Sequence, residues 1–242
     1  MNFKDTREIS QELSDIFKKI DRLPKVSCHK CKKIYSGKKE FFICSECIEK
    51  EQVRIEEKRK KDYKIQNLLH LANIPKRYED AIYKAKTEIQ SEVSRYFIEN
   101  FTQKSLKRST DILLFGAIGT GKTYISCAFI KELIKKSQIR IKYITEYDLL
   151  SLYFEKKYQK FRSFRECQIL ILDEIGKRVL ADWQRVQLEE LLSHRYNEML
   201  PTVYITNLEQ HDFRAFLGSR LADRLRENCL ERFAFDGESL RG

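Results

Sequence analysis

The sequence Ile112-Leu-Leu-Phe-Gly-Ala-Ile-Gly-Thr-Gly-Lys-Thr123 joins four apolar residues to a glycine-rich turn, and an apolar-rich stretch follows over residues 124–134. A buried strand, a tight turn and a helix in this order are the context of a phosphate-binding loop. Its glycines let backbone N–H groups turn inward, and the helix adds its positive N-terminal end. The predicted nucleotide-binding residues are Gly116, Ala117, Ile118, Gly119, Thr120, Gly121, Lys122, Thr123 and Tyr124.

Two of these side chains have a specific expected role. Lys122 is expected to neutralise charge on the β- and γ-phosphates, and the Thr123 hydroxyl is expected to ligate Mg²⁺. The alternative, a chance glycine turn before a helix, explains neither the lysine nor the threonine.

Polar residues end two further apolar runs. Residues 168–172 lead into Asp173 and Glu174, and residues 203–206 lead into Asn207. We expect Asp173 to hold Mg²⁺, Glu174 to polarise the attacking water, and Asn207 to orient that water or contact the γ-phosphate. The alternation of strand and helix patterns from residue 111 onward predicts an α/β fold whose parallel sheet is flanked by helices on both faces.

The cysteines indicate a second, smaller module. Cys28-His-Lys-Cys31 and Cys44-Ser-Glu-Cys47 are separated by twelve residues, a spacing that predicts a structural Zn²⁺ site with four thiolate ligands. An iron–sulfur centre is the alternative. Residues 34–35 and 41–43 are expected to form a hairpin between the two pairs, and residues 4–20 an amphipathic helix. The predicted domains are therefore a zinc-binding, partner-docking module (1–50), a charged helical linker (51–72) and an ATPase domain (73–242).

Charge limits the classes of partner. Lys and Arg number 47 against 36 Asp and Glu, a formal net charge of +11, which favours nucleic acid over other partners. No segment approaches the roughly 18 apolar residues of a membrane span, and the N-terminus has no apolar signal core, so no membrane association and a cytoplasmic location are expected. A basic surface that only keeps the chain solvated is the alternative.

The order of motifs resembles AAA+ ATPases, and more specifically the DnaC/DnaI-type helicase loaders of bacteria and phages and the related IstB-type transposition ATPases. The resemblance covers roughly residues 65–242 and depends on five stretches: Ile74-Pro-Lys-Arg-Tyr78, residues 116–123, Leu172-Asp-Glu-Ile175, Ile205-Thr-Asn207, and Leu217-Gly-Ser-Arg-Leu-Ala-Asp-Arg-Leu-Arg226.

This resemblance implies roles for three arginines. Arg224 matches the arginine finger that acts in a neighbouring subunit, Arg220 is a second candidate one helical turn earlier, and Arg241 matches a sensor-2 position. Asn207 matches sensor 1. Loaders of this type lack a C-terminal helical lid, and with few residues after Phe235 none is expected in this sequence. Without the resemblance, the arginines would fit an exposed helix with local ion pairs equally well.

Residues 151–165 alternate aromatic with basic side chains, and in the family this region contacts single-stranded DNA. Cations that follow a phosphate backbone and rings that stack on bases are the components of such a surface. The aromatic residues are Tyr153, Phe154, Tyr158, Phe161 and Phe164, and core packing is the alternative for each of them. The predicted DNA-binding residues are Lys156, Lys157, Lys160, Arg162 and Arg165.

The predicted function is an ATP-dependent loader that places a replicative ring helicase of the DnaB type on single-stranded DNA. Its zinc module would hold the helicase, and its ATPase domains would assemble into an ATP-dependent oligomer or ring-bound spiral with slow, assembly- or DNA-dependent hydrolysis. The main alternative is a transposition helper that binds duplex DNA and a transposase. A small-molecule kinase is a third, which would need neither Asn207 nor an arginine from a neighbour.

Overall fold

The computed structural model describes residues 11, 23–36, 43–101, 111–227 and 231–240. Apart from Gln11, the helix predicted over residues 4–20 lies outside the described residues, as does Arg241. The chain forms two compact units, Met1–Tyr63 and Lys64–Gly242, and the boundary falls within helix α2 (Ser45–Leu71). Within the described residues, no helix is apolar and long enough to cross a membrane.

The first unit contains a small antiparallel ladder. Strand β1 (Lys25–Ser27) pairs with β2 (Ile34–Ser36), with Val26 opposite Tyr35. The strand expected at residues 34–35 is therefore present, and the partner that the described residues show, β1, precedes the first cysteine pair. Phe41 and Phe42, expected to supply the partner strand, lie outside the described residues.

The second unit contains a five-stranded sheet in the order β4-β5-β6-β3-β7, and every neighbouring pair of strands is parallel. Its strands are β3 (Ile112–Gly116), β4 (Ile141–Thr145), β5 (Ile169–Asp173), β6 (Thr202–Ile205) and β7 (Glu231–Phe235). The helices are α3 (Glu88–Asn100), α4 (Lys122–Ser137), α5 (Glu146–Phe154), α6 (Tyr158–Arg165), α7 (Asp182–Asn197) and α8 (Gln210–Glu227), with a short 3₁₀ helix, η1 (Lys76–Tyr78).

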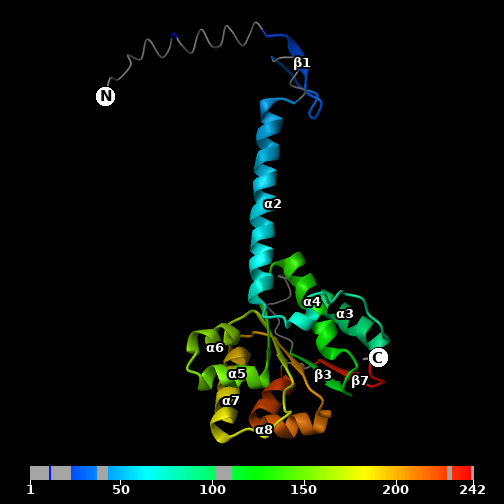
Figure 1. The fold of residues 1–242 in the computed structure, drawn as a ribbon, viewed down its shortest axis with the longest axis vertical. Coiled ribbons are helices and arrows are strands. Elements are labelled where there is room, and N and C mark those ends of the chain that lie inside the picture. Colours follow the sequence, from blue (N-terminus) through cyan, green and yellow to red (C-terminus); the bar gives the residue numbers. More distant parts are fainter. Residues whose placement is uncertain (1–10, 12–22, 37–42, 102–110, 228–230, 241–242) are drawn as a thin grey trace, which may run out of the picture. The chain divides into compact units, whose positions relative to one another are not determined.

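Helices cover both faces of this sheet (Figure 1), which confirms the predicted α/β fold. The inner strand β3, which lies between β6 and β7, contributes to both cores because successive side chains of a strand point to opposite faces. Ile112 and Leu114 pack in the core that contains α3 and α4, whereas Leu113 packs in the core that contains α5 to α8. The Phe97 ring of α3 stacks on the Phe129 ring of α4, with 4.0 Å between the ring centroids.

A buried arginine connects helix α7 to the segments that precede β5 and β6. The Arg195 side chain is 1% exposed, and its guanidinium donates to the Thr202 hydroxyl at 2.9 Å and to the Pro201 carbonyl at 2.6 Å. The same group also donates to three carbonyls around the end of α6, those of Phe164, Arg165 and Cys167. A buried guanidinium is tolerated because its donors are engaged.

Replacing Arg195 with Met is expected to lower the free energy of unfolding by about 3–5 kcal/mol, because several buried carbonyls lose their donor. Urea unfolding followed by the emission of Trp183, the single tryptophan of the chain, measures the change in the second unit. Arg226→Met is the matched control, since Arg226 forms an exposed ion pair with Asp223 and should cost less than about 1 kcal/mol. Equal losses in the two variants would contradict the role given to Arg195.

Candidate functional site

Three strands end together at one edge of the sheet and form a cavity of about 500 Å³. Strand β3 leads into the glycine-rich loop, β5 into Asp173 and Glu174, and β6 into Thr206 and Asn207. In the parallel register Leu114 lies opposite Ile205, and Leu172 lies opposite Tyr204, so the predicted residues of all three strand ends reach one space. Ligand-binding crevices of parallel sheets lie at this edge, and the volume is in the usual range for a small-molecule site.

The glycine-rich loop has the backbone shape that phosphate binding requires. Gly116 has φ +112°, and a Cβ there would lie 2.8 Å from the Phe235 carbonyl oxygen, so only glycine fits. Gly121, in the left-handed region, is the N-cap of α4, which points its helix N-terminus into the cavity region. Lys122 is buried, and its ammonium donates to the carbonyls of Gly116 at 2.8 Å and Ala117 at 2.7 Å.

The two predicted magnesium ligands lie in direct contact. The Thr123 hydroxyl donates to Asp173 Oδ2 at 2.8 Å, and the backbone N–H of Glu174 donates to Asp173 Oδ1 at 2.7 Å. Burial raises the pKa of Asp173, although these hydrogen bonds act in the opposite direction. A hydroxyl beside a carboxylate at the mouth of a phosphate-binding loop fits Mg²⁺, which takes few protein oxygens together with the phosphates of its substrate. Bound there, the ion would neutralise phosphate charge.

Tyr143 is a member of this site that the sequence analysis missed. It lies on β4, is buried, and its hydroxyl donates to Asp173 Oδ2 at 2.7 Å. Burial, together with the neighbouring Asp173 carboxylate, raises the pKa of Tyr143, so the phenol stays protonated and remains a donor. A tyrosine inside an apolar strand carries no motif, which is why no pattern revealed it.

The loop that carries Glu174 is fixed from both sides. The backbone of Ile175 donates to the Ile205 carbonyl at 3.1 Å, and the Thr206 hydroxyl donates to the Ile175 carbonyl at 2.7 Å. On the other side, Gly176 N–H donates to Glu146 Oε2 at 2.9 Å, and burial raises the pKa of this Glu146 carboxyl. Glu174 itself has φ +54°, a left-handed conformation that costs an L-residue of the order of 1 kcal/mol and that these contacts maintain.

Gln90 of α3 is a second residue that the sequence analysis missed. It is buried, its amide nitrogen donates to the Thr120 carbonyl at 3.3 Å, and its amide oxygen accepts from the Lys86 backbone at 2.8 Å. The segment before α3 also lines the cavity through Arg77, Tyr78 and Lys86. At the other end of the chain, Leu240 lines the cavity, and its N–H donates to the Gly119 carbonyl at 3.0 Å.

The arginines of α8 lie apart from this cavity. The helix is kinked at Gly218, where φ is 79° and ψ is 163°, and Arg220 and Arg224 follow the kink. Arg220 pairs with Glu189 at 3.2 Å, whereas Arg224 donates to the Ser193 hydroxyl and lies 5.3 Å from the centroid of the Tyr196 ring. Neither is among the described residues that line the cavity.

The aromatic and basic residues of α5, α6 and the segment between them differ in burial and in ion pairing. Phe161 and Phe164 are buried, so core packing, the alternative left open for the rings, holds for these two. Lys156, Lys157 and Lys160 are exposed. Arg162 and Arg165 both form ion pairs with Glu166, and Lys157 pairs with Glu155.

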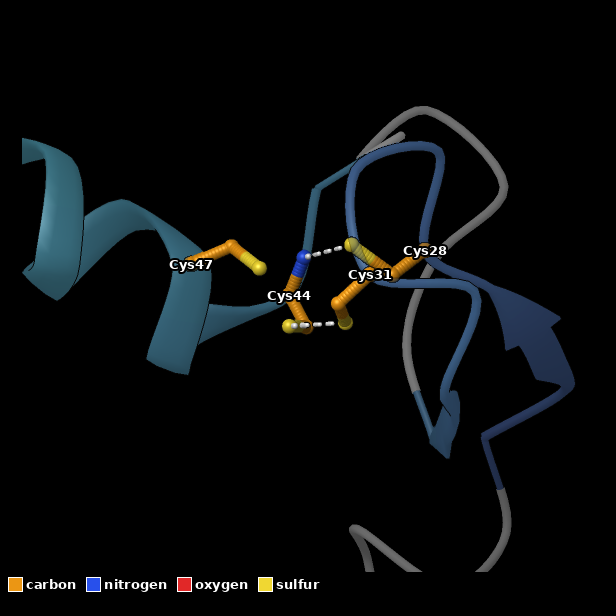
Figure 2. Close-up of side chains that lie close together, drawn as sticks. All are labelled: Cys28, Cys31, Cys44 and Cys47. Atoms are coloured by element: carbon orange, nitrogen blue, oxygen red, sulfur yellow. Dashed lines mark hydrogen bonds between the residues drawn. The ribbon is translucent and has the colours of Figure 1, made fainter.

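The four predicted zinc ligands, Cys28, Cys31, Cys44 and Cys47, converge in the first unit (Figure 2). Their sulfur atoms all lie within 4.8 Å of one another, with 3.7 Å between Cys31 and Cys44. A tetrahedral site with Zn–S bonds of about 2.3 Å separates its sulfurs by about 3.8 Å, so the cluster fits Zn²⁺.

The charge balance of the cluster also favours a cation. Backbone N–H groups lower the pKa of Cys28 to about 6, and the Cys44 N–H donates to its sulfur at 3.4 Å. In contrast, hydrogen bonding to the neighbouring thiols raises the pKa of Cys47 to about 12. A bound metal ion would hold all four sulfurs as thiolates and would thereby stabilise this small unit.

The geometry of the second unit defines a P-loop ATPase fold of the AAA+ class. A family model described as IstB-like ATP binding protein matches residues 42–241, and the chain belongs to this family. It is 28% identical over 163 residues to the Escherichia coli K12 protein "Uncharacterized protein YdaV", covering 64% of the chain and 65% of the relative.

Two further relatives have functional names. "Replicative helicase loader DnaC" of Escherichia coli K12 is 24% identical over 140 residues, 55% of each chain. "Replicative helicase loader DnaI" of Bacillus subtilis is 26% identical over 123 residues, 49% of this chain and 39% of the relative. The chain thus spans less than two thirds of the length of these curated relatives.

Solved structures agree with the fold. The crystal structure of the DnaC helicase loader has a TM-score of 0.57 at 27% identity and covers 66% of this chain and 99% of that one. The crystal structure of DnaI has a TM-score of 0.60 at 18% identity, with 72% and 99% covered, and supports the fold alone.

Removal of the Tyr143 hydroxyl is expected to raise the Mg²⁺ concentration needed for nucleotide binding by about tenfold, because Asp173 loses a partner that orients it. Titration of Tyr143→Phe with Mg²⁺ in the presence of a fluorescent ATP analogue measures this change. Tyr196→Phe is the matched control, since its hydroxyl bonds Glu227 outside the cavity. An unchanged Mg²⁺ requirement in Tyr143→Phe would show that Thr123 and the Glu174 backbone suffice.

The purified chain is expected to contain one zinc ion and to release it as the pH falls, because protons compete with the metal for the thiolates. Elemental analysis after dialysis over a pH series measures the content. The double variant Cys44→Ser, Cys47→Ser should contain none, whereas Cys127→Ser, which changes a buried thiol of α4, should retain it. Iron in place of zinc would restore the iron–sulfur alternative.

Proposed function

We propose that this chain is an ATP-dependent loader that places a DnaB-type replicative helicase on single-stranded DNA during initiation of replication. The observation that supports the proposal most is the joint placement of Thr123, Asp173, Glu174 and Asn207 at one cavity. The names of the relatives DnaC and DnaI point to the same role.

In the proposed reaction cycle, Lys122 holds the β- and γ-phosphates, and Thr123 and Asp173 hold the Mg²⁺ site. Glu174 then polarises the attacking water, which Asn207 orients. The phosphoryl group passes to water, and the products are ADP and phosphate. Hydrolysis is slow in the isolated chain and resets the loader, while ATP binding sets its loading state.

Completion of this site requires a second copy of the chain. Arg224, with Arg220 as the second candidate, lies on the far helix α8, so it would act on the nucleotide of a neighbouring subunit. We therefore propose ATP-dependent self-assembly into an oligomer or a spiral bound to the helicase ring. Arg241, in the sequence position of sensor 2, would contact the nucleotide bound by its own chain.

The remaining parts of the chain are proposed to bind the helicase and DNA. The zinc module docks the helicase, and Lys156, Lys157, Lys160, Arg162 and Arg165 contact single-stranded DNA, all in the cytoplasm. The name of the matching family favours one alternative, an IstB-like transposition helper. Such a helper would bind duplex DNA and a transposase.

Loading on a protein-coated single-stranded circle tests the proposal. The full chain and ATP should increase helicase unwinding of an annealed primer, and the variant Cys44→Ser, Cys47→Ser should lose capture of the helicase while it retains ATP binding. Preference for duplex DNA with no effect on the helicase would favour the transposition helper. Nucleoside-dependent ADP release would favour the kinase.

Arg224→Ala is expected to lower ATP turnover by about 10³-fold and to leave ATP binding unchanged, because its guanidinium stabilises charge that develops only during hydrolysis. Arg226→Ala, which removes an exposed arginine of the same helix, is the matched control.

Mixing two inactive variants gives a sharper outcome. Lys122→Ala chains retain Arg224, and Arg224→Ala chains retain a complete nucleotide pocket, so their mixture should regain turnover at mixed interfaces. If the mixture stays as inactive as its components, Arg224 does not act across subunits.

A further inference from the structure

Three aromatic side chains remain exposed on one side of the second unit. Phe154 of α5 is 74% exposed, Tyr158 at the start of α6 is 53% exposed, and Trp183 at the start of α7 is 41% exposed. Aromatic rings are the side chains that gain most from burial, so exposed rings that lie together mark a surface that a ligand covers.

These rings form one connected set across three helices. The rings of Phe154 and Trp183 are 6.0 Å apart with 32° between their planes. Tyr153, which is partly buried, stacks near Trp183 at 6.5 Å and 26°, and meets Tyr158 edge-on at 5.4 Å. Because Tyr153 also packs against the buried ring of Phe161, the row is anchored in the core. We call Phe154, Tyr158 and Trp183, with Tyr153 behind them, the aromatic row.

Basic residues occur in the same chain segments as the aromatic row. Lys156 and Lys160 belong to the same chain segment, and Arg178 precedes α7. None of these three forms an ion pair within the part of the chain that the structure describes, in contrast to Lys157, Arg162 and Arg165. Exposed rings together with unpaired cations suit a ligand that combines flat apolar faces with a phosphate backbone, which is single-stranded nucleic acid.

Arg178 also lies near the start of α5. The Arg178 guanidinium lies 4.1 Å from the centroid of the Tyr147 ring, and Tyr147 follows Glu146 on α5. Glu146 accepts the N–H of Gly176, two residues after Glu174. Tyr147 follows Glu146 directly and Arg178 follows Gly176 by two residues, so this hydrogen bond links the two segments that carry the Tyr147–Arg178 contact.

We propose that Trp183, together with Phe154 and Tyr158, stacks on the bases of single-stranded DNA, and that Arg178 extends the contact with its backbone. This inference rests on the proposed function, because it names the residues that bind the single strand of a helicase loader. It adds Trp183 and Arg178, which lie in and before α7, to the basic residues of α5 and α6. Duplex DNA would bind weakly, since its bases are already stacked and paired.

The chain carries its own probe for this contact, because Trp183 is its single tryptophan. Titration of the full chain with poly(dT) in the presence of ATP should quench the Trp183 emission, with the same midpoint as the fluorescence anisotropy of labelled poly(dT). Trp183→Ala should weaken poly(dT) binding by about 5- to 100-fold, the range expected for the loss of one stacked base. Trp183→Phe should retain most of the affinity.

Further variants separate stacking from folding. Phe154→Ala should weaken poly(dT) binding without the loss of a buried contact, and Arg178→Gln should reduce both the affinity and its salt dependence. Tyr63→Ala removes an exposed tyrosine of α2 and is the matched control, with unchanged affinity expected. Circular dichroism melting of every variant confirms that the fold is retained.

The outcomes distinguish this inference from the proposed function. If poly(dT) binds but the Trp183 emission and the affinity of Trp183→Ala do not change, the aromatic row is not the stacking surface, and the loader proposal stands. If Trp183→Ala binds poly(dT) normally and fails to capture the helicase, the row is a protein-docking surface and the inference is wrong. If the wild-type chain binds duplex DNA and no poly(dT), both fail.

Discussion

Parallel hydrogen bonding between β5, β6 and β3 is the constraint on which the chemistry of this chain depends. It brings the carboxyl ends of three strands to one edge, so that Thr123 and Asp173, fifty residues apart in sequence, come within 2.8 Å. Parallel strands need long crossover connections, and here helices provide them and bury both faces of the sheet. The same topology therefore produces the core and the site, and a strand shifted in register would lose both.

Three buried polar side chains hold the loops that follow the strand ends in position. Gln90 fixes the glycine-rich loop, Tyr143 fixes Asp173, and Glu146 fixes the loop after Glu174. Each is buried and satisfied by hydrogen bonds, which restrict its side chain to one rotamer. The strand ends determine where the predicted site residues lie, and these three residues determine how their surroundings are oriented. Glu146 has a further effect, because it belongs to the helix that begins the proposed DNA-binding surface.

Most of the fold and the motif residues could be predicted from the sequence because they follow local rules. The apolar runs that became β3, β5 and β6 end in glycine or acid and amide side chains, and the four cysteines have a spacing that few other arrangements share. Gln90, Tyr143 and Glu146 could not be predicted, since their roles come from contacts with residues 30 or more positions away. Tertiary packing also decides which strand pairs with β2 and whether Phe161 and Phe164 are buried. A local pattern of aromatic and charged residues does not contain this information.

The hydrogen bonds of Lys122 have a consequence for how a triphosphate enters the loop. Its ammonium already donates to the carbonyls of Gly116 and Ala117, so phosphate binding is an exchange of acceptors and not a simple addition. Part of the attraction is used to rearrange the loop, which lowers affinity but enlarges the structural response. The adjoining carbonyls of Gly119 and Thr120 accept from Leu240 and Gln90, so a rearrangement of the loop would change the contacts that hold both of these residues. Gln90 and Leu240 also line the cavity, which places α3 and the C-terminal segment where they would respond to whether the pocket is filled.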